Sequence, residues 1–133
     1  QVITTPGTIR RGTVAPLLAQ CEDAGIRTVL YTGVSPDPTV TEVDAAAECF
    51  FVSGCEAILA IGGGSVIDCA KVAGARTVRR DLPVRKMSGM LKIHKKLPLL
   101  LAVPTTAGTG SEVTLAAVIT DETCNYKHAV MDY

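Results

Sequence analysis

Residues 57–68 read AILAIGGGSVID, and they carry the clearest structural signal in the chain. Residues 57–61 are apolar throughout, which is typical of a strand buried on both faces of a parallel sheet. Three glycines follow, and helical spacing then begins, with Ile67, Ala70 and Gly74 on one face. The stretch therefore predicts a buried strand that turns directly into a helix.

Three further strands are expected around this unit. They are short apolar runs rich in branched side chains, at residues 2–5, 28–32 and 99–103, and the last is apolar throughout like 57–61. We expect residues 113–131 to form a C-terminal β-hairpin.

Two further helices are expected between the strands. Residues 14–24 carry apolar side chains at intervals of three and four, and Gly25 can end that helix. The other helix begins at Thr39, whose spacing from Glu42 is that of a capping box. Strands and helices thus alternate, which predicts an α/β fold with a parallel sheet and helices on both faces.

The composition fits one globular domain. The chain has 133 residues, 47% of them hydrophobic and 20% charged, and 13 basic residues balance 13 acidic ones. No apolar run is long enough to span a membrane, and the N-terminus carries no signal segment. Five cysteines form no CxxC pair, which favours a reducing compartment over a disulfide framework. We therefore expect a cytoplasmic domain with no membrane partner.

Eight of the thirteen basic side chains lie in residues 76–96, against the single acid Asp81. Such a run could bind the phosphates of a nucleic acid. It contains no Phe, Tyr or Trp to stack on bases, however, and Pro83 and Gly89 interrupt it. We therefore favour a solvated loop, with nucleic-acid binding as the less favoured alternative.

The glycine turn, Gly62, Gly63 and Gly64 followed by Ser65, is suited to binding phosphate. Glycines let a ligand approach the backbone, and the start of a helix presents free N–H groups and the positive end of its dipole. A tight turn also uses glycine but does not need three in succession, so we favour phosphate binding. The spacing is not the GxGxxG fingerprint, so the ligand could be any nucleotide or a sugar phosphate. Ser65 and Asp68 are also spaced as a helix cap.

A second loop rich in glycine and hydroxyl groups, PTTAGTGSE at residues 104–112, follows the strand at 99–103. Ligands of open parallel sheets bind at the carboxyl ends of the strands, so the two glycine loops could face one cleft. Thr105, Thr106 and Thr109 supply hydroxyl donors and acceptors there. A P-loop is not indicated, because GxxxxGK[ST] is absent.

The two motifs GGGSVIDCAK (62–71) and PTTAGTGSEVT (104–114) together resemble those of the iron-containing (group III) alcohol dehydrogenases. PDPT at residues 36–39, by itself a rigid turn, is similar to that family's proline-rich turn before the same helix. The resemblance implies a Rossmann-like dinucleotide-binding domain over residues 1–133, as a truncated part of a longer enzyme. The helical metal-binding domain of the family would be absent from this chain. The parent enzyme would transfer hydride between NAD or NADP and a small alcohol or aldehyde.

The resemblance also implies how the cofactor is held, and it assigns no catalytic residue to this chain. The pyrophosphate would lie on the glycine motif, at Gly62, Gly63, Gly64 and Ser65, with Asp68 in the same cofactor-binding set.

The remaining residues implied by the resemblance lie along the two halves of the cofactor. Thr105 and Thr106 would line its adenine-side half, and Thr109 would lie toward the nicotinamide. Asp37 falls near the adenosine end, and Lys127 falls near the nicotinamide ribose.

One departure from the family follows the first strand. Many members carry an aspartate there, which hydrogen-bonds the adenosine ribose and repels a 2′-phosphate. Thr5 stands at that position in this chain, and Arg10 and Arg11 follow it. Losing the carboxylate removes the repulsion against NADP, so both NAD and NADP are candidate cofactors.

The family's divalent metal, iron or zinc, is held by an aspartate and three histidines beyond this region. The chain has only His94 and His128, neither with a second histidine at ligand spacing, so we expect a metal only in the full-length parent. We also expect no dehydrogenase turnover from the chain alone. A non-catalytic nucleotide-binding module is the alternative function, and apolar surface left open by a missing half would allow a homo-oligomer.

Overall fold

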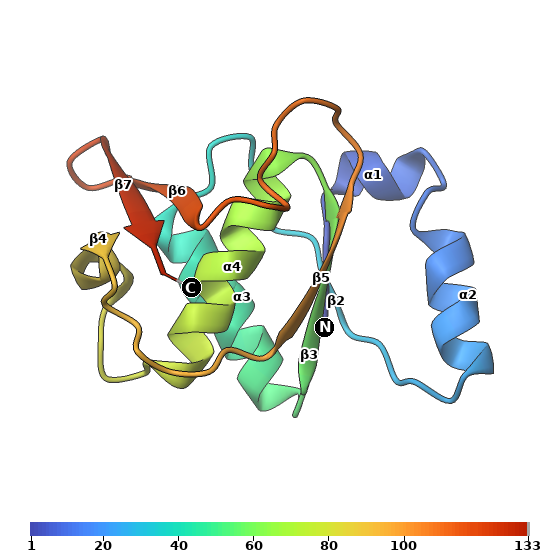
Figure 1. The fold of residues 1–133 in the computed structure, drawn as a ribbon. Helices are drawn as coiled ribbons and strands as arrows, with labels where there is room; N and C mark the ends of the chain where they lie inside the picture. Colours follow the sequence, from blue (N-terminus) through green and yellow to red (C-terminus); the bar gives the residue numbers. More distant parts are fainter. Residues whose placement is uncertain (133) are drawn as a thin grey trace.

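The computed structural model describes residues 1–132, and its main sheet contains four parallel strands in the order β2-β1-β3-β5 (Figure 1). Their bounds are Val2–Ile3 for β1, Leu30–Tyr31 for β2, Ala57–Gly62 for β3 and Leu99–Pro104 for β5. Each neighbouring pair runs parallel, and β3 pairs with β5 over its whole length. The predicted parallel sheet is confirmed.

Helices lie on both faces of this sheet (Figure 1). Helices α3 (Val40–Val52) and α4 (Gly64–Val78) cover one face, and α1 (Pro6–Arg10) and α2 (Ala15–Asp23) lie toward the other. Alternate side chains of β3 divide between the faces, because successive residues of a strand point to opposite sides.

The two faces are covered unequally. Ile58 and Ala60 belong to the large core beneath α3 and α4, whereas Ile61 packs with Val2 and Val14 in a small second cluster. No residue of α2 itself is buried. Most of the burial therefore lies between the sheet and the α3–α4 pair, which fixes where α4 begins.

Strand β5 corrects one expectation. We expected it to be buried on both faces, but it is the edge strand, and Leu99 and Leu101 are 62% and 54% exposed. Leu100 and Ala102 pack against the large core. An apolar run shows that a strand can be buried on both faces, but it does not show which of those faces the rest of the chain covers.

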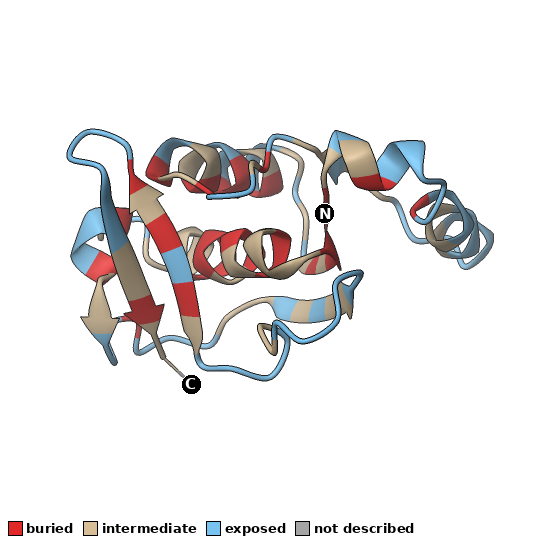
Figure 2. Ribbon diagram, turned by 90° about the horizontal axis from the view of Figure 1, so that it is seen from above, coloured by how far each residue is buried: buried red, intermediate tan, exposed pale blue. Residues whose placement is uncertain are grey.

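The predicted C-terminal hairpin is confirmed, and a third strand extends it. Strands β6 (Ala116–Asp121) and β7 (Tyr126–Met131) pair antiparallel, and β4 (Gly89–Met90) adds to β7, giving the order β4-β7-β6. Figure 2 shows the hairpin beside the α3–α4 pair, on the side away from α1 and α2. Strand β6 contacts α4, so the hairpin is attached to the same helix that follows the glycine turn.

The basic segment is more ordered than the expected solvated loop. It contains a 3₁₀-helix, η1 (Val84–Met87), as well as β4, and the side chains of Val84, Met87 and Ile93 are buried in the large core. These apolar side chains, spaced irregularly among lysines and arginines, gave no periodic signal in the sequence.

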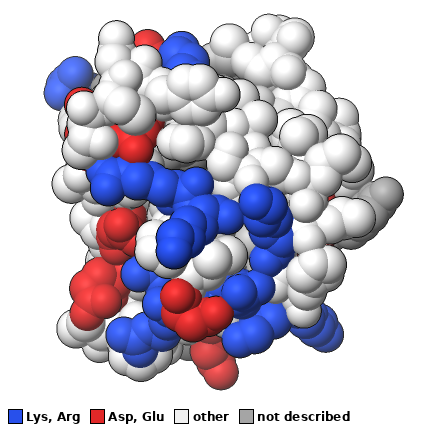
Figure 3. All heavy atoms as spheres, turned by 90° about the vertical axis from the view of Figure 1, so that its left-hand side faces the viewer, with Lys and Arg blue, Asp and Glu red and all other residues white. Residues whose placement is uncertain are grey.

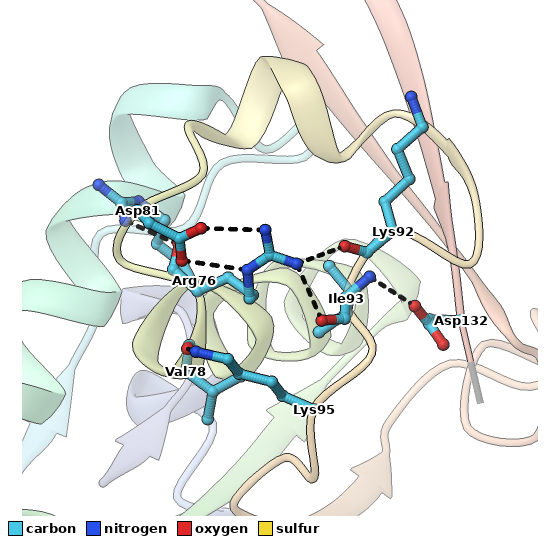
Figure 4. Close-up of polar contacts among 8 residues, drawn as sticks. Arg76, Val78, Asp81, Lys92, Ile93, Lys95 and Asp132 are labelled. Carbon is cyan, nitrogen blue, oxygen red and sulfur yellow. Dashed lines mark hydrogen bonds and ion pairs between the residues drawn. The ribbon is translucent and has the colours of Figure 1, made fainter.

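Arginines of this segment hold its backbone in place. Arg79 donates two hydrogen bonds to Asp81, both of 3.0 Å, and its Nη1 donates to the carbonyls of Lys92 and Ile93 (Figure 4). The Ile93 N–H donates to Asp132 Oδ2 at 2.7 Å. Some of the positive side chains of this segment are thus held in contacts within the fold.

The hairpin carries a buried carboxylate that joins it to η1. Asp121 is 3% exposed and accepts hydrogen bonds from the backbone N–H and hydroxyl of Thr123, and Arg85 Nε lies 2.5 Å from its Oδ2. These contacts hold the pKa of Asp121 well below its ordinary value, first through the Thr123 hydroxyl and then through Arg85.

None of the helices formed by residues 1–132 combines the length and apolar character that crossing a membrane requires.

Candidate functional site

The carboxyl ends of the parallel strands are fastened together at one edge of the sheet. Thr4, directly after β1, donates from its hydroxyl to the Ile61 carbonyl at 2.7 Å. The Thr105 N–H, directly after β5, donates to the Gly62 carbonyl at 2.8 Å. The segments that follow β1, β3 and β5 therefore leave the sheet side by side, which is where open parallel sheets bind ligands.

The glycine turn leaves the start of α4 uncapped. Gly63 is the N-cap residue, no side chain accepts a hydrogen bond from the first turn, and that turn contains no acid. The predicted cap by Ser65 and Asp68 is therefore wrong. Within residues 1–132 the Gly64 and Ser65 N–H groups have no hydrogen-bond partner. Free N–H groups at the positive end of a helix dipole form an anion-binding surface.

Ser65 and Asp68 are instead tied to neighbouring segments. The Ser65 hydroxyl donates to the Pro36 carbonyl, which fastens the loop after β2 across the start of α4. Asp68 Oδ2 accepts from the Val118 N–H at 3.0 Å, and its Oδ1 is buried without a partner among the described residues. Asp68 thus anchors β6 on α4.

Lys71 anchors the segment just before β6. Its Nζ donates to the Thr114 carbonyl at 2.7 Å, to the Thr114 hydroxyl at 3.2 Å and to the Ala116 carbonyl at 3.1 Å. Burial lowers the pKa of Lys71, against the opposing effect of Asp68 and Glu112. Lys71 therefore fixes where the second glycine loop ends.

The three glycines are required by close packing. A Cβ at Gly62 would lie 2.5 Å from Val66 Cγ2, and one at Gly63 would lie 3.0 Å from the Thr106 hydroxyl. A Cβ at Gly64 would lie 2.9 Å from Ser111 Oγ and 3.5 Å from Thr109 Cβ. The structure thus brings the two glycine loops together, with Thr106 and Thr109 beside the turn. Thr105 is exposed at the end of β5.

Asp37 and Lys127, which are ninety residues apart, form an ion pair of 2.8 Å. Both are exposed, at 71% and 60% of their side-chain surface, and the Thr120 N–H on β6 donates to the Pro38 carbonyl at 2.8 Å. The hairpin therefore closes over the loop that Ser65 holds. The pairing was not foreseen, because nothing local in the sequence links a turn after β2 to a strand near the C-terminus.

Thr5 lies on the other side of the turn, at the start of α1. Its hydroxyl accepts from the Thr8 N–H at 3.1 Å and lies 2.9 Å from the Thr8 hydroxyl. The hairpin and α1 lie on opposite sides of the start of α4 (Figures 1 and 2). The candidate residues thus extend from α1, across the glycine turn, to the hairpin.

Residues 1–132 contain no group of three or more His, Cys, Asp or Glu side chains arranged to hold a metal ion. His128 lies on β7, with Nε2 3.8 Å from Asp121, and His94 is exposed in the basic segment. The residues present do not fit a metal centre.

Part of the charge of the basic segment is paired within the fold. Figure 3 shows its Lys and Arg side chains gathered on one face with acidic groups among them. Arg76 pairs with Asp44 at 2.7 Å, Arg80 stacks on Phe51 at 3.8 Å, and Arg79 is held by Asp81. Three of the eight basic side chains in residues 76–96 are thus paired with carboxylates within the fold, which reduces the charge they offer to a polyanion.

Comparison with known proteins gives consistent matches. The family model described as iron-containing alcohol dehydrogenase matches residues 1–133. The choline dehydrogenase of Bacillus subtilis (strain 168) is 38% identical over 128 residues, which are 95% of this chain and 32% of that protein. The lactaldehyde reductase of Escherichia coli (strain K12) is 36% identical over 132 residues, which are 98% of this chain and 35% of that protein.

Solved structures agree. The crystal structure of a 1,3-propanediol oxidoreductase superposes with a TM-score of 0.93 at 32% identity, over 98% of this chain and 34% of that one. The structure of a sulfoacetaldehyde reductase from Bifidobacterium kashiwanohense in complex with NAD⁺ superposes with a TM-score of 0.81 at 36% identity. The match covers 98% of this chain and 34% of that one. The chain thus spans about a third of the length of the relatives it matches.

Proposed function

The chain belongs to the iron-containing alcohol dehydrogenase family, and on that premise we propose that it binds a nicotinamide dinucleotide for an enzyme that interconverts alcohols and aldehydes. The family membership supports the oxidoreductase class of the parent. The cofactor site proposed for this chain rests on its own residues.

The observation that carries the proposal is the uncapped start of α4. The free N–H groups of Gly64 and Ser65 face an edge where only glycine fits, and the hydroxyls of Thr106 and Thr109 lie beside them. A pyrophosphate needs several donors, a positive potential and close approach to the backbone, and this turn offers all three. We assign the pyrophosphate to this turn, with Gly62 needed for its packing.

The two riboses of the cofactor can be assigned to the two sides of the glycine turn. The resemblance assigns Asp37 and Lys127 to different ends of the dinucleotide, but their ion pair holds them together. Because the pyrophosphate separates the two riboses, a single pair serves one of them. The pair lies on the hairpin side and Thr5 on the α1 side, so we assign the pair to the nicotinamide ribose and Thr5 to the adenosine ribose.

When bound, the nicotinamide ring gives or accepts the hydride. The chain's own residues bind and orient the cofactor: the turn fixes the pyrophosphate, and Asp37 and Lys127 can accept from and donate to ribose hydroxyls. Asp68 and Lys71 hold the hairpin and the second loop in register with the turn.

The metal and the substrate are assigned to parts of the parent protein outside this chain, because the described residues do not fit a metal centre. The chain by itself is therefore proposed to bind cofactor without dehydrogenase turnover.

The test is a titration of the 133-residue chain with NADH, following nicotinamide fluorescence, after circular dichroism has shown that the chain is folded. Gly64→Asp places a carboxylate at the phosphate. Its Cβ comes closer than 3.0 Å only to the Ser111 hydroxyl, which can rotate away, and the start of a helix tolerates Asp, so we expect a folded chain without saturable binding. Gly25→Asp is the matched control, since a Cβ there meets nothing within 4 Å, Asp adopts the positive φ of +71° more readily than most residues, and the turn lies at the opposite edge of the sheet. Equal binding by both variants would refute the site.

A further inference from the structure

The first helix carries two arginines that no acid neutralises. Residues 1–21 contain no Asp or Glu, and within the described chain neither Arg10 nor Arg11 forms an ion pair. By contrast, Arg76, Arg79 and Arg85 are each paired with a carboxylate. The two unpaired guanidinium groups therefore give the α1 side of the glycine turn a net positive charge.

The two guanidinium groups converge on Thr5 rather than pointing into solvent separately. The position that a Cβ would take at Gly7 lies 3.5 Å from Arg11 Nη1, 3.6 Å from the Thr5 hydroxyl and 4.0 Å from Arg10 Nη2. Because residue 7 is glycine, no side chain fills this position. Three donor groups thus surround one open point above α1.

Hydrogen bonds to Thr8 hold the side chains of Arg11 and Thr5 in this arrangement. Arg11 Nη2 donates to the buried Thr8 hydroxyl at 3.1 Å, and that hydroxyl lies 2.9 Å from the Thr5 hydroxyl. The Thr13 hydroxyl donates to the Thr8 carbonyl at 3.1 Å, which holds the end of α1. A guanidinium that is already oriented loses less freedom when it binds an anion.

The position of this cluster matches one part of the cofactor. Thr5 follows β1, the neighbour of β3, so the backbone of Thr5 lies about one strand spacing, ~4.8 Å, to the side of the glycine turn, and the two arginines lie beyond it on α1. A pyrophosphate on the turn places the adenosine ribose on this side under the proposed function. The group that distinguishes NADP from NAD is the phosphate on the 2′ carbon of that ribose.

Resting on that proposed function, we propose that Arg10, Arg11 and the Thr5 hydroxyl bind the 2′-phosphate and make this chain select NADP(H) over NAD(H). Arginine binds phosphate through charge-assisted, often bidentate hydrogen bonds. A carboxylate at residue 5 would accept from a ribose 2′-hydroxyl and repel a phosphate, whereas threonine does not repel it. Nothing in the cluster favours the unphosphorylated ribose.

The experiment compares the Kd values of NADPH and NADH for the 133-residue chain. We expect NADPH to bind at least roughly tenfold more tightly at low salt, with the ratio falling as salt screens the exposed arginines. Arg11→Ala and Arg10→Ala are each expected to weaken NADPH roughly tenfold and to change NADH by less than about twofold. Lys86→Ala is the matched control, because it removes an exposed positive charge on η1, across the molecule from α1.

Two further variants keep α1 intact while changing its chemistry. Thr5→Asp retains a good N-cap residue and is expected to reverse the preference toward NADH. Gly7→Glu can pair with Arg11 one turn later, which supports the helix while neutralising the cluster. Competition by 2′,5′-ADP against 5′-AMP isolates the phosphate, and we expect 2′,5′-ADP to compete better until Arg11 is replaced.

The outcomes separate this proposal from the one on which it rests. Saturable NADH binding that equals or exceeds NADPH binding would overturn the selectivity and leave the dinucleotide site standing. An equal loss of both cofactors in Arg11→Ala would also overturn it, since the arginine would then act on the fold. If a folded chain binds neither cofactor, the dinucleotide site fails, and the selectivity fails with it.

Discussion

Replacing Gly62 by alanine is expected to destabilise the fold through its contacts with one neighbouring side chain, that of Val66. The added Cβ would lie 2.5 Å from Val66 Cγ2, 2.8 Å from its Cβ and 3.2 Å from its Cγ1. Val66 is 2% exposed in the first turn of α4, and a valine in a helix has essentially one rotamer. The valine therefore cannot turn away, and α4 must shift from the end of β3.

The magnitude follows from two opposing terms. Overpacking a core costs about 1–3 kcal/mol, and a 2.5 Å approach belongs at the upper end of that range. Alanine restricts the unfolded chain and returns about 0.4–1 kcal/mol. The net loss is about 2 kcal/mol, which lowers the Tm of a chain of this size by roughly 8 °C.

Thermal melts followed by circular dichroism measure this fall in the Tm of Gly62→Ala, with Gly74→Ala as the matched control. A Cβ at Gly74 meets Ile58 Cδ1 at 3.5 Å, an ordinary contact, and alanine favours the helix, so its Tm should hold or rise. In Gly62→Ala/Val66→Ala the contacts of 2.5 and 3.2 Å with the valine methyl groups are gone and only the 2.8 Å contact with Cβ remains, so the two substitutions should couple favourably by about 1 kcal/mol. Additive effects, or equal melts for Gly62→Ala and Gly74→Ala, would refute the packing argument.

Three other predictions concern the hairpin and the cysteines. The pKa of Asp121 is lowered from its ordinary value of 3.8, so the ionised carboxylate stabilises the fold at any pH above 3.8, and this stabilisation is lost as the pH falls below that value. Asp121→Asn should therefore lower the Tm at pH 7, and its Tm should be closer to that of the unsubstituted chain at pH 3. Burial raises the pKa of Cys69 to about 12, so a thiol reagent at pH 8 should label the exposed Cys124 in the native chain and Cys69 only after unfolding. Lys127→Met breaks an exposed pair with Asp37 worth less than about 1 kcal/mol, so it should weaken NADH binding several-fold while Tm stays within about 4 °C.

The sequence predicted those parts of the fold whose signals are local. The apolar run at 57–61 and the capping box of Thr39 and Glu42 each specify their own segment, and both are confirmed. The exposed face of β5 and the buried anchors of the basic segment depend on what packs against them. Such tertiary outcomes leave no periodic pattern in the chain.

The candidate site divides in the same way. Its glycine motif could be located from the order of the residues alone, because three glycines between an apolar run and a helix are a local feature. The cap by Ser65 and Asp68 had the right spacing, but Pro36 and Val118 compete for those side chains. The contact of Asp37 with Lys127 joins residues ninety positions apart, which no local pattern can show.

The proposed cofactor site depends above all on the free N–H groups at the start of α4, which would hold the pyrophosphate. Amide chemical shifts of the ¹⁵N-labelled chain, recorded while NADPH is added, test it most directly. We expect the largest shifts at Gly64 and Ser65, with the amides of Gly25 and Gly54 at the opposite edge unchanged. Saturable shifts confined to residues 76–96, with the glycine turn unmoved, would contradict it.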